Sequence, residues 1–108
     1  MTVKWTKKEQ RAVQIQRDGL KYTFTDAGIE HYGEQRLVER EIRNLAELRK
    51  EWAKQADETA AHYLAHFKNR EIHDTFRDNA AKYRKEGAWY AKLADKVRDN
   101  GMPNSEDS

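Results

Sequence analysis

Between residues 13 and 24, apolar and polar side chains alternate on either side of Asp18-Gly19. Alternation with a period of two is typical of a strand with one buried face, and Asp-Gly between two such segments is typical of a two-residue hairpin turn. The predicted apolar face consists of Val13, Ile15, Leu20, Tyr22 and Phe24. We therefore predict a β-hairpin within residues 1–25.

The same segment begins with a competing helix signal. Thr6 and Glu9 have the spacing of a capping box, in which each side chain accepts a hydrogen bond from the other residue's backbone N–H. We expect at most a short helical turn there, with strand from about Ala12 onward.

From residue 26 to residue 99 the apolar spacing changes to three and four, which is typical of long helices with one buried stripe. The stripes before and after residues 69–70 mirror one another, which predicts an antiparallel helical hairpin over 26–99 with its turn near 69–70. Large side chains then face small ones: Tyr83 faces Ala56 and Trp52 faces Gly87. The alternative is one continuous helix whose stripes pair with a second chain.

The first predicted helix extends past the end of the second, so residues 29–39 have no helix opposite them. The apolar face of the β-hairpin is their expected cover. The predicted fold class is mainly α with a small β element: an N-terminal β-hairpin packed on the overhanging end of a long antiparallel helical hairpin, in a single domain. Residues 100–108 follow a helix stop and are expected to form a flexible acidic tail.

The amino-acid composition excludes several classes of protein. The 108 residues include no Cys, which excludes a disulfide scaffold, a cysteine-based zinc site and a thiol nucleophile. The serines, Ser105 and Ser108, both lie in the polar tail. No apolar run approaches the ~18 residues of a membrane span. We expect a cytoplasmic protein that is not an enzyme and has no membrane partner, no cofactor and no small-molecule substrate.

Four histidines raise the question of a metal. His62 and His66 are four residues apart on a predicted helix, so both could reach one ion. A third ligand is not evident, since His73-Asp74 comes after the predicted turn. We therefore predict no metal site and interpret the pair as surface histidines.

Positive charge concentrates at the N-terminus. Residues 1–25 carry six basic side chains against two acidic ones, although the whole chain has a net charge of only +2. The basic residues are Lys4, Lys7, Lys8, Arg11, Arg17 and Lys21. A two-stranded ribbon fits the major groove of DNA, so nucleic-acid contact through these residues is the alternative function.

Apolar side chains outside the buried stripe form a second candidate surface. Leu37, Leu48, Leu93 and Trp89 lie about 80–120° from the stripe, on one side of the predicted helical hairpin. Two helices cannot bury such a patch, so the β-hairpin, a second copy or a foreign protein must cover it. Tryptophan is frequent at interface hot spots.

We therefore predict a small non-enzymatic interaction protein: a regulator, adaptor or inhibitor that binds and occludes another macromolecule, with a homodimer as one arrangement. Its predicted interface comprises Trp89, Leu93, Leu48 and Leu37. The alternative is a nucleic-acid-binding accessory protein that uses the basic N-terminal ribbon.

Overall fold

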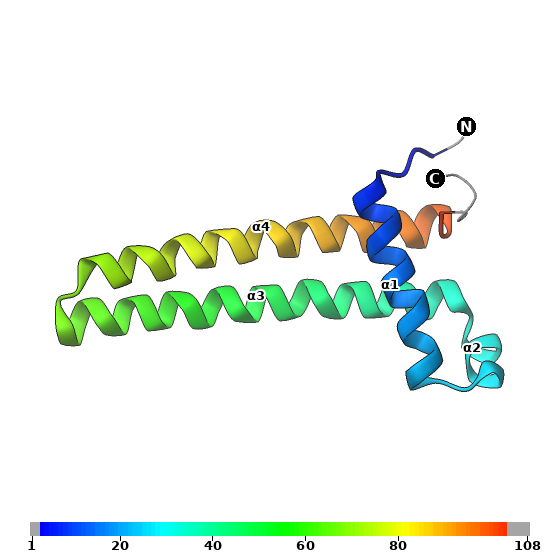
Figure 1. Cartoon of the computed structure of the whole chain (residues 1–108), viewed down its shortest axis with the longest axis horizontal. Helices are drawn as coiled ribbons and strands as arrows, with labels where there is room; N and C mark the ends of the chain where they lie inside the picture. Colours follow the sequence, from blue (N-terminus) through cyan, green and yellow to red (C-terminus); the bar gives the residue numbers. More distant parts are fainter. Residues whose placement is uncertain (1–2, 104–108) are drawn as a thin grey trace. The chain divides into compact units, whose positions relative to one another are not determined.

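The computed structural model describes residues 3–103, and within that range the chain forms four α-helices and no strand (Figure 1). The helices are α1 (Lys7–Thr23), α2 (Asp26–Tyr32), α3 (Glu34–Phe67) and α4 (Arg70–Asn100). They contribute to two compact units. The terminal unit contains the chain up to Asn44 and from Ala91 onward, and the hairpin unit is Leu45–Tyr90. No helix in the described range combines the length and the apolar character that a membrane crossing needs.

The predicted β-hairpin of residues 1–25 is wrong, because this segment is the helix α1. The competing capping box is the signal that prevails: the Thr6 hydroxyl accepts from the Glu9 N–H at 3.1 Å, and the Glu9 carboxylate accepts from the Thr6 N–H at 2.9 Å. Val13 and Leu20, which are two helical turns apart, are buried, whereas Tyr22 is 93% exposed. The buried positions therefore follow the helical period and not the period of two.

Asp18-Gly19 lies on the outward side of α1. The Asp18 carboxylate accepts a hydrogen bond from the Gln14 amide at 2.9 Å, the spacing of a helical i, i+4 pair. A type I′ turn needs positive φ at both central residues. Of the described residues only Gly33, Lys68 and Gly101 have positive φ. The pair is therefore accommodated in the helix, at a cost of about 1 kcal/mol for the glycine.

The terminal unit has a core of large apolar side chains drawn from three helices. The core residues are Val13 and Leu20 of α1, Leu37, Val38 and Ile42 of α3, and Leu93, Ala94 and Val97 of α4. Helix α1 thus occupies the covering position that was predicted for the β-hairpin.

Two ion pairs join α1 to the other helices of the terminal unit. Lys96 of α4 pairs with the Glu9 carboxylate at 3.0 Å, and its ammonium lies 4.6 Å from the centre of the Trp5 ring. Arg17 pairs with Glu34 at the start of α3. Burial raises the pKa of Glu9, but hydrogen bonds from Thr6 and Lys96 outweigh it, so the pKa lies below its ordinary value.

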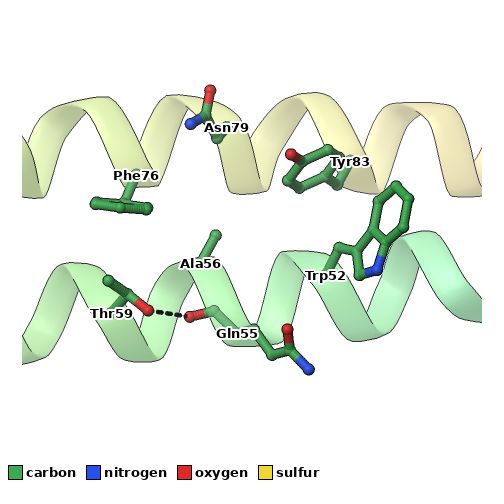
Figure 2. Close-up of a pocket in the computed structure, with 7 residues that line it drawn as sticks. All are labelled: Trp52, Gln55, Ala56, Thr59, Phe76, Asn79 and Tyr83. Carbon is green, nitrogen blue, oxygen red and sulfur yellow. Dashed lines mark hydrogen bonds between the residues drawn. The ribbon is translucent and has the colours of Figure 1, made fainter.

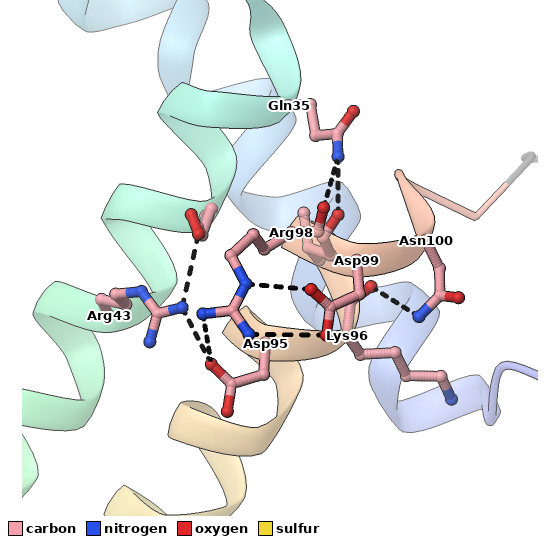
Figure 3. A network of polar contacts seen from close by, with 9 residues as sticks. Gln35, Arg43, Asp95, Lys96, Arg98, Asp99 and Asn100 are labelled. Atoms are coloured by element: carbon pink, nitrogen blue, oxygen red, sulfur yellow. Dashed lines mark hydrogen bonds and ion pairs between the residues drawn. The ribbon is translucent and has the colours of Figure 1, made fainter.

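Polar contacts also join the start of α3 to the end of α4 (Figure 3). The Gln35 amide donates to the carbonyls of Val97 and Arg98 at 2.8 and 3.2 Å, and Arg43 pairs with Asp95 at 2.9 Å. Carbonyls in the last turn of a helix lack helical partners, so Gln35 satisfies the Arg98 carbonyl and gives the Val97 carbonyl a donor besides the Gly101 N–H.

Helix α4 ends inside the segment predicted as a flexible tail. Asn100 is its last residue, Gly101 has φ 77° and donates its N–H to the Val97 carbonyl, and Pro103 is buried. Residues 104–108 of that predicted tail lie outside the described residues.

In the hairpin unit, α3 and α4 run side by side in opposite directions, as predicted (Figure 1). The chain reverses at Lys68, which has φ 51°, and at Asn69, whose side chain accepts from the Ile72 N–H at 3.0 Å and so begins α4. The break lies between Phe67 and Arg70 and is centred one residue earlier than predicted.

Tyr83 packs against the buried cluster containing Ala56, as predicted. The nearest neighbours of Gly87 differ from the prediction: a side chain there would first meet Ala46, Arg49 and Lys50 rather than Trp52.

Candidate interaction surface

The four predicted interface residues divide between the two units. Leu37 and Leu93 are buried in the terminal unit. Leu48 and Trp89 belong to the hairpin unit, where Leu48 is 42% exposed and Trp89 is half-buried with its ring 5.1 Å from that of Tyr90. Leu37 and Leu93 are therefore core residues, and Leu48 and Trp89 retain exposed area.

The hairpin unit differs sharply from the terminal unit in what it buries. Within Leu45–Tyr90, all of which is described, the fully buried apolar side chains are alanines: Ala46, Ala53, Ala56, Ala60 and Ala80. The large apolar side chains stay half-buried or exposed, including Trp52 at 37% and Phe67 at 64%. Two helices alone can enclose small side chains between them but cannot cover aromatic rings.

The rings gather along one side of the hairpin, where they line a groove of about 390 Å³ (Figure 2). Its lining comprises Trp52, Gln55, Ala56, Thr59, Phe76, Asn79 and Tyr83. The ring centres of Trp52 and Tyr83 are 5.5 Å apart and meet edge to face, and Phe76 stacks on Tyr63 at 6.0 Å. The apolar spacing predicted that Trp52 and Tyr83 are buried between the two helices. The missed signal was that alanine alternates with them and takes the central positions.

Arg49 holds the end of this groove in place. Its guanidinium lies 4.3 Å from the centre of the Trp52 ring and 5.6 Å from that of Tyr90, and it pairs with Glu86 at 2.9 Å. A cation held between two rings and a carboxylate fixes the Trp52 ring relative to both helices.

The groove side of the hairpin unit carries little charge. At about 100° per residue, the α3 positions on this side are Leu48, Trp52, Gln55, Thr59, Tyr63 and the two histidines His62 and His66. None of them is Asp, Glu, Lys or Arg, and the charged groups at the end of the groove, Arg49 and Glu86, pair with one another. In Figure 2 the Gln55 and Asn79 amides extend away from the rings.

The opposite side of the hairpin unit is ionic. Asp57 of α3 pairs with Arg84 of α4, and Arg77 lies 3.6 Å from its other carboxylate oxygen. The hydrogen bond from Arg84 is the main cause that lowers the pKa of Asp57. The two sides thus have the contrast that distinguishes a contact face from a solvated one.

The basic residues predicted to contact nucleic acid are arranged by α1. Lys7, Lys8, Arg11 and Lys21 are exposed on the helix, and Lys4 is exposed just before it. Arg17 points the other way, into its contact with Glu34. Arg17 and Lys21, one turn apart, line a small groove with Glu34, so helix formation separates these two from Lys4, Lys7, Lys8 and Arg11.

The histidine pair is close, but no third metal ligand joins it among the described residues. The His62 and His66 rings are 4.5 Å apart, and His73 is hydrogen-bonded to Asp74 at 3.0 Å. Within residues 3–103 no three His, Cys, Asp or Glu side chains are grouped to hold a metal ion.

Comparison of the chain with family models, with curated proteins and with solved structures finds no match.

Proposed function

We propose that this protein is a non-enzymatic interaction protein, and that the aromatic groove of its hairpin unit binds a second copy of the chain. The observation that carries the proposal is the alanine-only core of this unit, which leaves Trp52, Phe76 and Tyr83 lining an open groove. The resulting dimer acts as a regulator, adaptor or inhibitor that covers the surface of another macromolecule.

The aromatic rings of the groove need to be covered whenever the chain is folded. Burial of an aromatic side chain stabilises by several kcal/mol, and a two-helix hairpin with small core residues lacks that contribution. A partner that is always available at the right concentration is another copy of the same chain, and for such dimers folding and association are coupled.

The size of the face suits a dimer. The α3 segment of the hairpin unit is about 34 Å long and two adjacent helices are about 20 Å wide, which gives about 680 Å² per copy. Two such faces bury about 1,400 Å² in total, within the usual range for stable interfaces. Two hairpins packed face to face would form a four-helix bundle, a common solution for this geometry.

The polarity of the face also suits self-association. A two-fold dimer places each residue against the same surface of its partner, so a charged groove would repel itself. The lining residues of this groove are uncharged, and Glu86, which lies on the same side of α4, is neutralised by Arg49. Two copies can therefore approach without burying unpaired charge.

The non-enzymatic part of the proposal rests on composition. The chain has no Cys, and its serines are Ser105 and Ser108 of the C-terminal tail. Binding through shape and apolar contact needs none of these nucleophiles.

Sedimentation velocity on two matched double variants tests the proposal. Gln55→Lys with Asn79→Lys adds two like charges to the groove side at exposed positions. Ala61→Lys with Ala81→Lys adds the same charge at exposed positions on the other side of the hairpin. The wild-type chain and the Ala61/Ala81 variant should sediment as dimers, and the Gln55/Asn79 variant should shift toward monomer with at least a tenfold weaker Kd.

A monomeric wild-type chain at 100 μM would overturn the proposal. Equal weakening in both double variants would also overturn it, because the effect would then come from net charge and not from the groove.

A further inference from the structure

Helix α1 sorts its charged side chains by sign between its two sides. Glu9 faces the terminal unit, where it contacts Lys96, and Arg17 likewise faces Glu34. The remaining charged side chains of the helix are exposed, and among them Asp18 is the one acid. Its carboxylate is already hydrogen-bonded to the Gln14 amide. The outward side of the helix therefore carries four cationic side chains against one carboxylate.

This positive charge is densest in the first half of the helix. Lys7, Lys8 and Arg11 lie within about 100° of one another on the first turns of α1, and Lys4 is exposed just before the helix begins. Lys21 lies further along, beside Asp26 and Glu34 on a small groove of about 250 Å³, where acidic groups offset its charge. Lys7 and Arg11 make no ion pair within residues 3–103.

We infer that this side of α1 binds the phosphate backbone of double-stranded nucleic acid. The basic face is defined as Lys4, Lys7, Lys8 and Arg11. Duplex DNA carries one negative charge per ~1.7 Å of helix axis, a density that few other partners reach. An α-helix fits the major groove, and the exposed Gln14, about one turn after Arg11, continues the outward side as a polar group.

Electrostatic contact of this kind has a characteristic salt dependence. About four phosphate contacts give a slope of roughly −3.6 in a plot of log affinity against log salt. Raising the salt from about 50 to about 200 mM should therefore weaken binding about 150-fold.

The test is fluorescence anisotropy of a labelled 20-base-pair duplex at both salt concentrations. Lys7→Glu with Arg11→Glu reverses two charges of the basic face. Both side chains are exposed, and Glu in the first turn, at position 7, favours helix formation. Lys54→Glu with Lys85→Glu makes the same change in net charge at exposed positions of the hairpin unit.

The Lys7/Arg11 variant should bind the duplex at least tenfold more weakly at 50 mM salt and show a shallower salt slope, while the Lys54/Lys85 variant stays close to wild type. Equal loss in both variants would overturn the inference, as would unchanged binding by the Lys7/Arg11 variant. Displacement of the duplex by poly-glutamate at the same charge concentration would overturn the choice of nucleic acid and identify an acidic protein as the partner. Far-ultraviolet circular dichroism confirms that each variant is folded.

Discussion

Single glycines show how strongly the surroundings of a residue decide its role. A side chain at Gly19 would meet no atom within 4 Å, because this residue lies on the exposed side of α1. A side chain at Gly87 would lie 3.2 Å from the Ala46 carbonyl and 3.4 Å from the Arg49 side chain. The first glycine weakens its helix without structural need, and the second lets α3 and α4 approach closely.

Alanine substitution should therefore have different effects at the two sites. Gly19→Ala should raise the free energy of unfolding by about 0.5–1 kcal/mol, because alanine is the better helix former and the site is open. For Gly87→Ala the free energy of unfolding should rise by less than this or should fall, because the new methyl group makes a close contact with the backbone of α3. Urea unfolding followed by circular dichroism measures both.

A loss of stability in Gly19→Ala would contradict the helical structure of α1, since only a turn with positive φ would penalise alanine there.

The helix α1 explains why part of the fold could be predicted and part could not. Its sequence satisfies two periods at once: Val13 and Ile15, and likewise Leu20 and Tyr22, alternate as in a strand, while Val13 and Leu20 also share one side of a helix. The spacing of apolar residues within this segment does not distinguish a strand from a helix. Docking decides between them, because the terminal unit buries Val13 and Leu20 and leaves Ile15 and Tyr22 in solvent. The capping box at Thr6 was the local signal for the correct answer.

Within α1, Glu9 should make the free energy of unfolding depend on pH. Its lowered pKa means that the folded chain holds the carboxylate charged to lower pH than the unfolded chain does. The stabilisation is complete above the ordinary glutamate pKa and is lost as the pH falls through the lowered value. Glu9→Gln should cost about 1 kcal/mol at neutral pH, and the difference from wild type should shrink toward zero in acid.

Thermal unfolding at a series of pH values measures this difference. Glu30→Gln, at an exposed position of α2, provides the control and should follow the wild-type curve. A Glu9→Gln difference that stays constant down to acidic pH would show that the carboxylate charge does not stabilise α1.

For the molecule as a whole, the helical hairpin was predictable and the division of its apolar surface was not. The mirrored stripes and the turn near residue 69 were visible in the spacing of apolar residues, which depends on helix geometry alone. The interface prediction relied on angles around ideal helices and ignored what α1 covers. Leu37 and Leu93 are buried in the terminal unit, whereas Leu48 and Trp89 belong to the hairpin unit, whose core is built from alanine.

The most direct test of the central claim detects contacts between two copies at the groove. A sample that mixes carbon-13-labelled and unlabelled chains gives isotope-filtered nuclear Overhauser effects that arise only between copies. Such effects are expected at the ring protons of Trp52, Phe76 and Tyr83, the rings that line the groove. Their absence at these rings, in a sample of several hundred micromolar chain, would contradict the claim that a second copy covers the groove.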